Sequence, residues 1–355
     1  MARVLVAGGM GFIGSHLIDR LLQRTDVEEC LVVDNLWTGC ERNLAHILDP
    51  RLKTLIGDIE TAPLSGHFDE IYHLASPATP TWYMAEPVRT ISANVGGALR
   101  LLQVLAPGGQ IAYSSTSEVY GDPLVSPQPE SYRGCVDCTG PRASYDESKR
   151  CVEALLLEAH RVSGVRVKVV RMFNVFGPRT RVDDGRAVSN FVSQALRGAP
   201  ITIFGDGTQT RSWGYVDDIL EALERYFWRD GVDYPGPVNI GNDREVPVLD
   251  VAQFIQRRFP QCPIVHLPPV PQDPTNRRPD LALANKILPG WSCATPYEEG
   301  VERTIAWFRQ DMGLDHAKPI IVPAQTLPQM KRTPTDDDAG SPIEPPAPVT
   351  VQPSV

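Results

Sequence analysis

The sequence has no long apolar run and no excess of positive charge. No stretch approaches the roughly 20 apolar residues that a membrane-spanning helix needs, and a strand pattern begins at the N-terminus without room for a signal peptide. The 34 Lys and Arg against 43 Asp and Glu give a net charge of −9, which repels nucleic acid and anionic membranes. We therefore expect a cytoplasmic protein that binds neither.

Cysteine is also scarce, with seven residues scattered through 355. An odd number at irregular spacing is not typical of a disulfide framework and fits a reducing compartment. Cys135 and Cys138 form a single Cys-x-x-Cys pair, but no second pair follows at the spacing of a zinc site. A zinc or redox role for this pair is disfavoured, and we expect no metal.

The composition, 42% hydrophobic and 22% charged, is typical of a globular protein. The length suits one large or two modest domains. Short apolar runs alternate with amphipathic stretches over the first 175 residues, which is typical of βα units on a parallel sheet. This pattern predicts an α/β fold with a doubly wound parallel Rossmann-type sheet. Strands are expected over 4–7, 31–34, 52–56, 71–75, 110–114 and 165–172, and helices over 12–22, 87–105 and 144–161.

The second half of the chain is less regular. A strand is expected over 201–204, and helices over 187–197, 216–228, 248–258 and 296–309. We predict an NAD-binding Rossmann domain over 1–175, to which the chain returns near 212–240, and a smaller, mostly helical C-terminal substrate domain from 176–211 and 241–315. The last 37 residues contain nine prolines and no aromatic residue, so 316–355 is expected to be a disordered Pro-rich tail.

A glycine-rich turn lies between the first predicted strand and helix. Gly8, Gly11 and Gly14 stand where backbone N–H groups and a helix dipole can hold a pyrophosphate. The next strand ends in Asp34 and Asn35, and a carboxylate there accepts hydrogen bonds from an adenosine ribose while repelling a 2′-phosphate. The two features predict NAD rather than NADP, with a glycine turn and a strand-end Asp cap as the plainer alternative.

Tyr145 and Lys149 lie four residues apart near the start of a predicted helix, so both side chains project from one face. A phenol is a poor base at neutral pH, but an adjacent ammonium and an oxidised nicotinamide would stabilise its phenolate. Such pairs are common on surface helices, yet this one follows a dinucleotide motif and a polar run at a strand end. We predict that Tyr145 is a general base.

These features resemble the extended short-chain dehydrogenases/reductases that act on nucleotide sugars, and within them the UDP-glucuronate decarboxylases. The resemblance spans about residues 1–312 and is far more specific than either short motif alone. The shared stretches are Tyr72–Pro77, Ser115–Pro123, Gly140–Arg150, Phe173–Arg179, Asp184–Phe191 and Gln209–Arg211.

The resemblance implies three groups of site residues. The family's catalytic residues match Tyr145, Lys149, Thr116, Ser117, Glu118 and Arg277. Its NAD-binding residues match Gly8, Gly11, Phe12, Ile13, Gly14, Asp34, Asn35, Thr38, Gly39, Asp58, Ile59, Leu74, Ser76, Tyr145 and Lys149. Its substrate-binding residues match Asn94, Asn174, Arg179, Arg186, Asn190, Arg211 and Arg277.

The resemblance also implies a reaction. In the family's mechanism, the tyrosine that matches Tyr145 takes the proton of the sugar 4-hydroxyl while C4 passes hydride to NAD. The C5 carboxylate then belongs to a β-keto acid, which loses carbon dioxide. Protonation at C5 and return of the hydride give the pentose, so the implied reaction converts UDP-glucuronate to UDP-xylose.

Ser117 and Glu118 separate the chain from its sister enzymes. The 4,6-dehydratases carry Asp-Glu here, because loss of water from C6 needs an acid that protonates the leaving hydroxyl, and 4-epimerases generally lack the Glu. Glu118 is a candidate acid/base at C5 or a contact of the carboxylate-bearing carbon, and its plainer role is a turn or helix N-terminal carboxylate. A 4-epimerase, a 4,6-dehydratase and a non-catalytic nucleotide-sensing module remain as alternatives.

The implied substrate is a trianion, so an acidic protein must concentrate positive charge at its site. The resemblance implies that Arg186 and Arg211 face the diphosphate and that Arg277 approaches the substrate. Guanidinium groups suit such oxygens because they bind in a forked geometry. Two roles stay open for Arg181 and Arg278. Each either contacts the substrate or belongs to a solvated loop of arginines.

Two further expectations follow from the resemblance. Family members commonly carry Lys where this chain has Ser92, which raises the hypothesis that some 4-keto pentose escapes and leaves NADH bound. The predicted helices over 87–105 and 144–161 carry more Leu, Val and Ala than one packed face requires, which fits the family's four-helix dimer interface. A homodimer is therefore expected.

Overall fold

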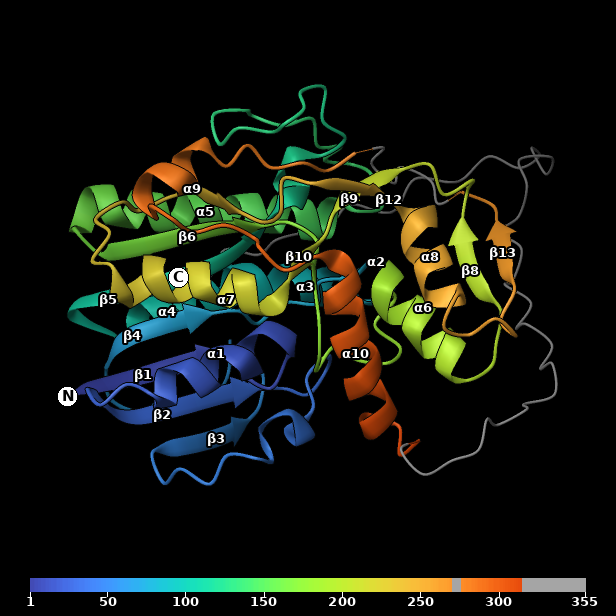
Figure 1. Cartoon of the computed structure of the whole chain (residues 1–355). Coiled ribbons are helices and arrows are strands. Elements are labelled where there is room, and N and C mark those ends of the chain that lie inside the picture. Colours follow the sequence, from blue (N-terminus) through green and yellow to red (C-terminus); the bar gives the residue numbers. More distant parts are fainter. Residues whose placement is uncertain (270–275, 315–355) are drawn as a thin grey trace, which may run out of the picture. The chain divides into compact units, whose positions relative to one another are not determined.

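The computed structural model describes residues 1–269 and 276–314. The predicted tail over 316–355 lies outside the described residues, as do 270–275 and residue 315 of the predicted substrate domain. Seven parallel strands form the central sheet in the order β11-β6-β5-β4-β1-β2-β3 (Figure 1). The predicted α/β class and doubly wound Rossmann-type sheet are confirmed.

The chain alternates between this sheet and the helices that cover it. The strands are β1 (Ala2–Ala7), β2 (Val27–Asp34), β3 (Leu52–Ile56), β4 (Phe68–His73), β5 (Leu105–Thr116), β6 (Arg166–Met172) and β11 (Val238–Ile240). The helices are α1 (Phe12–Leu22), α2 (Pro80–Tyr83), α3 (Pro87–Ile91), α4 (Gly97–Gln103), α5 (Ala143–Ser163) and α7 (Val216–Glu224). Short helical turns are η1 (Glu41–Leu44), η2 (Ser92–Gly96), η3 (Ser117–Tyr120) and η4 (Arg225–Arg229).

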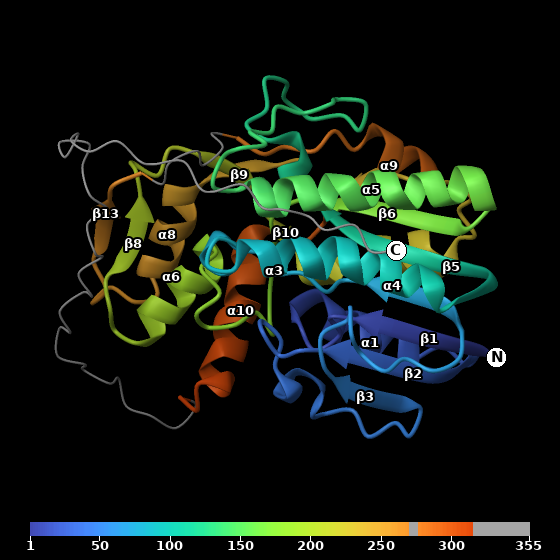
Figure 2. The ribbon, with the colours of Figure 1, turned by 180° about the vertical axis from the view of Figure 1, so that it is seen from behind.

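The two faces of the sheet bury separate apolar cores. In β1, Val4 and Val6 belong to the core that α1 and α7 cover, whereas Leu5 and Ala7 belong to the core that α4 and α5 cover. Figure 2 shows α5 beside the run formed by α3, η2 and α4 on one face of the sheet. Successive residues of a strand point to opposite faces, so a central parallel strand must be apolar throughout. The continuous apolar run over 4–7 is the sequence signal of that burial.

The helix predicted over 87–105 is confirmed as a continuous helical run over 87–103, made of α3, η2 and α4. Its middle turn, η2, is π-helical, and the run ends at Gln103, two residues before the predicted end. Gly96 and Gly97 follow one another here, and glycine weakens a helix by about 1 kcal/mol relative to alanine. A Cβ on Gly97 would lie 2.7 Å from the Ile59 side chain, so this glycine permits close packing against the loop after β3.

The second half of the chain forms helices α6 (Ala187–Leu196), α8 (Val248–Gln256), α9 (Ala282–Ile287) and α10 (Tyr297–Asp311), with three short strand pairs. The pairs are β7 (Val175–Phe176) with β10 (Gly214–Tyr215), β9 (Thr210–Ser212) with β12 (Glu245–Pro247), and β8 (Ile201–Phe204) with β13 (Ile264–Leu267). The predicted strand over 201–204 is confirmed. The division into two domains stays a prediction.

The order of the strands creates a switch point. β1 lies between β2 and β4, so successive units extend in opposite directions from the middle of the sheet. Ligands of such sheets bind outside the carboxyl ends of the strands at this point. The segments after β1, β4 and β5 begin at Gly8, Leu74 and Ser117, and each carries one of the predicted motifs.

A largely buried ion pair joins α5 to β6. Arg171 contacts Glu153 at 2.9 Å from Nε to Oε1 and at 2.7 Å from Nη2 to Oε2, with 12% and 8% of the two side chains exposed. Ser115 donates to Glu153 at 2.5 Å, and Arg171 donates to the Tyr120 hydroxyl at 2.9 Å. Removal of one charge would leave the other buried and uncompensated.

Arg171→Met should lower the free energy of unfolding by about 3 kcal/mol, because Glu153 stays buried without its counter-charge. Arg161→Met is the matched control, since Arg161 pairs with Glu158 at 2.7 Å on the exposed side of α5, where a pair contributes roughly 0.5 kcal/mol. Denaturant unfolding followed by circular dichroism measures both variants. Equal losses would contradict a stabilising role for the buried pair.

Candidate active site

The loop between β1 and α1 brings backbone segments unusually close together. Gly8 has a φ of 80°, and a Cβ there would lie 2.7 Å from the backbone nitrogen of Ala75. A Cβ on Gly14 would lie 2.3 Å from the carbonyl oxygen of Gly8. Gly11 caps α1, whose first turn at Phe12–Ile13 leaves backbone N–H groups unpaired. The loop therefore fits a dinucleotide diphosphate, which requires close approach of the backbone.

Asp34 ends β2 and is held by the neighbouring loops. Its Oδ2 accepts from the backbone N–H of Met10 and its Oδ1 from that of Leu36, both at 2.9 Å. Burial raises the pKa of Asp34, and these two hydrogen bonds oppose the rise. A Cβ on Gly39 would lie 2.7 Å from the carboxylate, so the segment that also holds Thr38 folds closely over it. The carboxylate is thus fixed at the switch point of the sheet.

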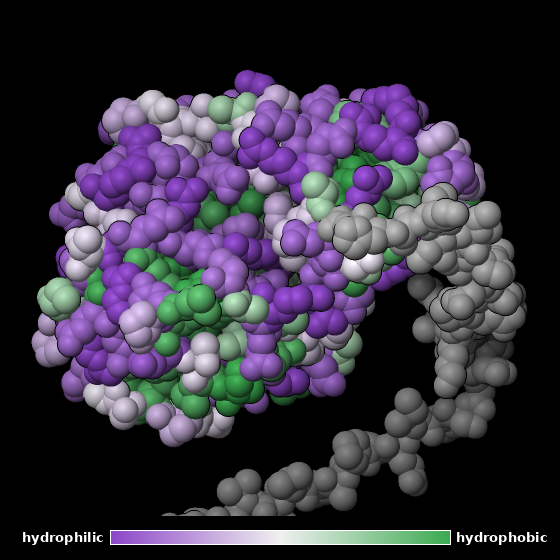
Figure 3. Space-filling model, turned by 60° about the horizontal axis from the view of Figure 1, so that its bottom comes forward, coloured by the Kyte–Doolittle hydropathy of each residue, from purple (hydrophilic) through white to green (hydrophobic). Residues whose placement is uncertain are grey.

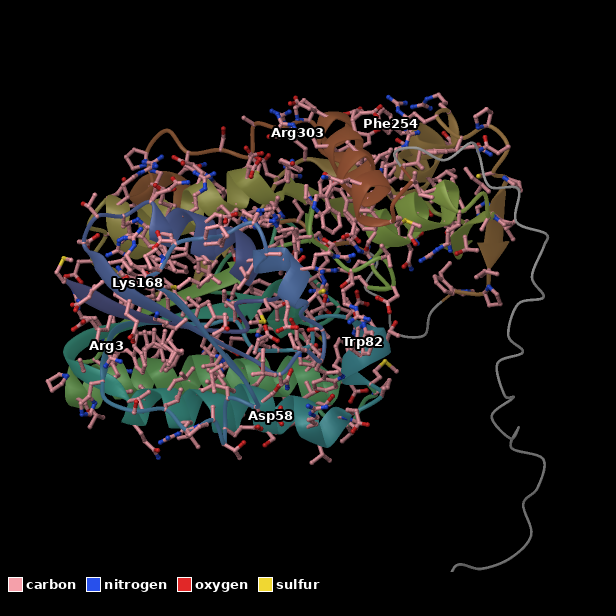
Figure 4. All side chains as sticks on the ribbon, turned by 90° about the horizontal axis from the view of Figure 1, so that it is seen from below. Arg3, Asp58, Trp82, Lys168, Phe254 and Arg303 are labelled. Atoms are coloured by element: carbon pink, nitrogen blue, oxygen red, sulfur yellow. The ribbon has the colours of Figure 1, made fainter. Side chains whose placement is uncertain are left out.

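Asn35 and Asp58 form a rim at the ends of β2 and β3. Asn35 donates to Asp58, and Arg89 donates to the same oxygen at 3.2 Å while its guanidinium lies 4.4 Å from the centre of the Trp37 ring. The Asn35 hydrogen bond, aided by Arg89, lowers the pKa of Asp58, which is labelled in Figure 4. Ile59, the next residue, is buried. This rim offers a carboxylate beside Asp34.

The segment after β4 closes the other side of the switch point. Leu74 donates its backbone N–H to Ala7 at 2.9 Å, and Ser76 follows, half-buried. Asn94 lies deeper, where its carbonyl oxygen is 3.0 Å from Nε2 of His73 and its amide donates to Ser148 at 2.9 Å. The Asn94 amide nitrogen is therefore directed to α5, whereas its Oδ1 is buried with no partner among the described residues.

Tyr145, near the start of α5, lies beside Thr116 at the end of β5. The side chains are hydrogen-bonded, and the residues are only 5% and 8% exposed. Burial raises the pKa of Tyr145 well above its usual value, whereas Thr116 and the charge of Arg186 act the other way. The buried Ser117 follows Thr116 and opens η3. The phenol is therefore neutral in the protein alone and needs further positive charge to act as a base.

Lys149 lies one helical turn after Tyr145 and is 2% exposed. Its Nζ donates to the carbonyl oxygen of Ser114 at 2.7 Å and lies 4.9 Å from the Tyr113 ring centre and 5.6 Å from that of Tyr145. Burial lowers the pKa of Lys149 to about 7, against the attraction of Glu153. Near neutral pH this amine therefore exchanges between its charged and neutral forms.

No sequence pattern pointed to Tyr83, yet its ring stacks on that of Tyr145. The ring centres are 4.8 Å apart and the planes differ by 9°. Tyr83 is 1% exposed, and its hydroxyl is buried with no hydrogen-bond partner among the described residues. Its neighbour Trp82, labelled in Figure 4, lies 4.9 Å from the guanidinium of Arg181. α2 is too short to show a period, so only the fold could reveal this stack.

Four charged residues gather beside Tyr145, and we call Glu118, Arg142, Asp146 and Arg277 the charge cluster. Glu118 pairs with Arg142 and also with Arg277, at 2.8 Å from Nη2 to Oε2. Arg277 is 2% exposed, and its Nε and Nη1 are buried with no partner among the described residues. A guanidinium therefore retains two unused donors in a dry part of the site.

The pKa values in the charge cluster separate its two carboxyl groups. Burial by itself would raise the pKa of Glu118, but the charges of Arg277 and Arg142 outweigh it and lower the pKa to about 2. Burial raises the pKa of Asp146 to about 7, and the carboxylate of Glu118 adds to the rise. Glu118 is thus ionised at neutral pH, whereas Asp146 is partly protonated. Arg142 and Asp146 had no predicted role.

Asn174, Arg186 and Arg211 contribute to the same region. Asn174 has a φ of 36°, and its Nδ2 is buried without a partner in the described chain. Arg186 pairs with Asp184 at 2.5 Å, and its guanidinium lies 5.6 Å from the ring of Phe12 at the start of α1. The charge of Arg211, on β9, acts on the charge cluster. Backbone strain and orphan donors of this kind are typical of ligand sites.

Two predicted substrate residues are engaged elsewhere. Arg179 pairs with Asp19 of α1 at 2.7 Å and lies 3.4 Å from Nε2 of His46. Asn190, on α6, donates its Nδ2 to the carbonyl oxygen of Gly185 at 3.1 Å. A contact of either residue with substrate stays a prediction.

Some kinds of site are absent from the described ranges. Within 1–269 and 276–314, no group of three His, Cys, Asp or Glu side chains is placed to hold a metal ion. No helix in this part of the chain has both the length and the apolar character to cross a membrane. Cys135 and Cys138 are exposed free thiols.

Comparison with known proteins places the chain among nucleotide-sugar enzymes. A sequence model of the NAD dependent epimerase/dehydratase family matches residues 4–241. The chain is 44% identical to UDP-glucuronic acid decarboxylase 6 of Arabidopsis thaliana over 315 residues, which cover 88% of this chain and 90% of that protein. It is 42% identical to UDP-glucuronic acid decarboxylase 1 of Danio rerio over 333 residues, 93% of this chain and 78% of that protein.

Solved structures share the fold. The UDP-glucuronic acid 4-epimerase of Bacillus cereus, in complex with UDP-glucuronic acid and NAD, matches with a TM-score of 0.76 and 26% identity over 87% of this chain and 99% of that one. The dTDP-glucose 4,6-dehydratase of Streptomyces venezuelae, with NAD bound, matches with a TM-score of 0.77 and 25% identity over 88% and 98%. NAD is the cofactor of this family, as the loop after β1 and Asp34 predicted.

Gly14→Ala should weaken NAD binding by roughly ten- to a hundred-fold, because overpacking the loop costs about 1–3 kcal/mol. Gly57→Ala is the matched control, since a Cβ there meets no atom within 4 Å. Calorimetric titration with NAD measures both, and circular dichroism checks that each variant folds. An unchanged dissociation constant in a folded Gly14→Ala protein would contradict the placement of the diphosphate.

The family match extends from β1 into β11, and so covers every strand of the central sheet. The alignments with the decarboxylases extend over most of the chain and include the second half, where Arg211 and Arg277 lie. The chain therefore belongs to the NAD dependent epimerase/dehydratase family and, within it, to the UDP-glucuronic acid decarboxylases.

Proposed function

We propose that the protein decarboxylates UDP-glucuronate to UDP-xylose with NAD as its cofactor. The observation that carries the proposal is the buried guanidinium of Arg277, which keeps two donors unpaired beside Glu118. Unpaired cationic donors in a dry site are suited to an anion. A uronic acid brings a carboxylate to C5 of the sugar, whereas a neutral hexose does not.

Other cations are proposed to bind the diphosphate. Arg186 lies between the start of α1 and Tyr145, on which its charge acts. The charge of Arg211 acts on Glu118 from β9. The strained Asn174 holds a buried amide donor for a substrate oxygen. These groups supply the local positive charge that a trianion requires in an acidic protein.

Tyr145 is proposed to take the proton of the sugar 4-hydroxyl. NAD, held by the glycine loop after β1 and by Asp34, would supply the acceptor for the C4 hydride and a positive charge that favours the phenolate of Tyr145. Thr116 holds the Tyr145 hydroxyl by a hydrogen bond, and Lys149 adds positive charge in its protonated form. Stacking on Tyr83 fixes the plane of the Tyr145 ring. The protein thus keeps the first proton on Tyr145 until the ketone is reduced.

Carbon dioxide is lost because the carboxylate then lies β to a ketone. The C5–C6 bond breaks and its electron pair moves toward the C4 oxygen, to which the protonated Tyr145 can donate a hydrogen bond. A proton then forms the new C5–H bond, so each turnover consumes one proton. Tyr145 finally returns its proton to the C4 oxygen.

Glu118 is proposed to position the arginines rather than to supply the C5 proton. Its pKa of about 2 leaves it ionised at neutral pH, with no proton to donate. Its ion pairs hold Arg142 on one side and Arg277 on the other. This favours the role of a contact near the carboxylate-bearing carbon over that of a general acid.

A 4-epimerase acting on UDP-glucuronate is the second candidate, because the Bacillus cereus 4-epimerase shares the fold and binds that uronic acid. A 4,6-dehydratase is disfavoured, since Ser117 stands where those enzymes carry the leaving-group acid. A nucleotide sensor would not need Tyr145, Lys149 and Thr116 in one buried constellation. Ser92, which stands where the family commonly carries Lys, is exposed on η2. Analysis of the products tests the hypothesis that some 4-keto pentose escapes.

Protein supplied with UDP-glucuronate and NAD should release carbon dioxide and form UDP-xylose, identified by NMR of the sugars. Tyr145→Phe should lower the rate by about two to four orders of magnitude, the scale of a general base. Tyr132→Phe is the control, because the Tyr132 hydroxyl accepts from the backbone of Leu124 at 3.1 Å in an exposed contact.

Epimerised UDP-sugar without carbon dioxide would favour the second candidate. Turnover of a neutral hexose nucleotide, with UDP-glucuronate left unchanged, would overturn the proposal. A 4-keto pentose together with enzyme-bound NADH would reveal incomplete return of the hydride, while decarboxylation itself would stand.

A homodimer through α3, α4 and α5 is also proposed. Val88, Ile91 and Leu99 are large exposed apolar residues of α3 and α4, and Val162 is exposed near the end of α5. α5 lies beside the run of α3, η2 and α4 (Figure 2). Figure 3, which views another side of the molecule, shows a mostly hydrophilic surface with scattered apolar patches. A second copy would cover the exposed apolar residues of α3, α4 and α5 in a four-helix bundle. The cytoplasmic location stays a prediction.

Sedimentation should give two chains per particle at micromolar concentration, and the double variant Val88→Asp and Leu99→Asp should give one. Buried like charges at a symmetric interface oppose association, because each appears twice across the two-fold axis. Leu124→Asp is the control, since Leu124 is exposed in the loop after η3. A native particle of one chain would reject the dimer.

A further inference from the structure

Asp146 is the member of the charge cluster that makes no ion pair and no side-chain hydrogen bond in the described part of the chain. Asp146 is 5% exposed, and its Oδ1 is buried with no hydrogen-bond partner within 1–269 and 276–314. Glu118, in contrast, takes both arginines. A carboxylate loses its hydration on burial, and the charges of Arg142 and Arg277 offset only part of that loss for Asp146, so burial favours the neutral acid.

We propose that Asp146 binds a proton as the substrate carboxylate enters beside Arg277, and that this coupling selects a uronic acid. The inference rests on the proposed function and names the group that tunes the charge of that same site. Asp146 thereby acts on substrate binding through the charge cluster, and it is a positioning residue rather than a catalytic one.

The charges around Asp146 come from four parts of the chain. The groups that act on it are Glu118 of η3, Arg142 before α5, Arg277 before α9, Tyr83 of α2, and Tyr145 and Glu147 of α5. Glu147 has its own partner, Arg150, at 3.4 Å. With Asp146 neutral, two arginines and Glu118 give the charge cluster a net charge of +1, and with Asp146 ionised the net charge is zero.

The sign of the pH effect follows from this count. The pKa of Asp146 is raised to about 7, so at lower pH it is neutral and the cluster attracts an anion. At higher pH Asp146 ionises, and an entering carboxylate must either meet a neutral cluster or draw a proton onto Asp146. Binding of the anion and protonation of Asp146 therefore favour one another. The bound ligand carboxylate raises the pKa of Asp146 further, so that Asp146 takes up a proton from solution when the ligand binds. Decarboxylation consumes one proton per turnover.

The test uses the NAD-bound Tyr145→Phe protein, which keeps the charge cluster and should consume the ligand about two to four orders of magnitude more slowly. Calorimetry with UDP-glucuronate should give a dissociation constant that rises about ten-fold between pH 6 and pH 8.5, a range in which the ligand's own carboxyl stays ionised. At pH 8, titrations in two buffers of different ionisation enthalpy should show uptake of a large fraction of one proton. UDP-xylose, which lacks the carboxylate, should show neither effect.

Asp146→Asn in the same background should bind UDP-glucuronate with an unchanged affinity at pH 6, no pH dependence and no proton uptake. Uptake that persists in Asp146→Asn would assign the proton to another group, such as Lys149, and overturn the inference. A flat pH profile without uptake in the Tyr145→Phe protein alone would also overturn it, even if Asp146→Asn failed to fold. Absence of any UDP-glucuronate binding or turnover would instead reject the proposed function.

Discussion

Two guanidinium groups share the carboxylate of Glu118, and the proposed chemistry depends on that sharing. Arg142 and Arg277 come from distant parts of the chain, and without an anion between them they would repel one another in a poorly hydrated site. Glu118 removes this repulsion yet leaves Nε and Nη1 of Arg277 with no partner in the part of the chain that the structure describes. Burial raises the pKa of the neighbouring Asp146 to about 7, and the shared carboxylate of Glu118 adds to the rise, because a second anion nearby is unfavourable.

The parallel sheet makes this arrangement possible. Every strand of the sheet ends at the same edge, so the loop after β1, the end of β2 and the turn after β5 meet there. The first two hold the elements that fit a dinucleotide, and the third carries Thr116 and Glu118. α5 then brings Tyr145 and Lys149 to the same edge. A buried guanidinium such as that of Arg277 is tolerated because its partners approach from this rigid scaffold.

Much of the fold was predictable because residues that are buried in strands and helices recur as regular apolar patterns in the sequence. Runs such as 4–7 are apolar on both faces, and Asp34 follows its strand at the spacing of a ribose-binding carboxylate. The π-helical turn η2 and the pairing of β8 with β13 were not predictable. Short strands and single helical turns carry too few residues to show a period, and their partners lie far away in the sequence.

The sequence by itself determined the sheet, the glycine loop and the placement of Tyr145 and Lys149 on one helix face, because these depend on neighbours along the chain. Only the tertiary structure decided that Tyr83 stacks on Tyr145, that Arg142 and Arg277 meet on Glu118, and that Asp146 is buried with no ion pair of its own among the described residues. Ion pairs and burial decide whether an ionisable side chain is charged or neutral in the folded protein. Both arise from contacts between distant segments, which no local pattern encodes.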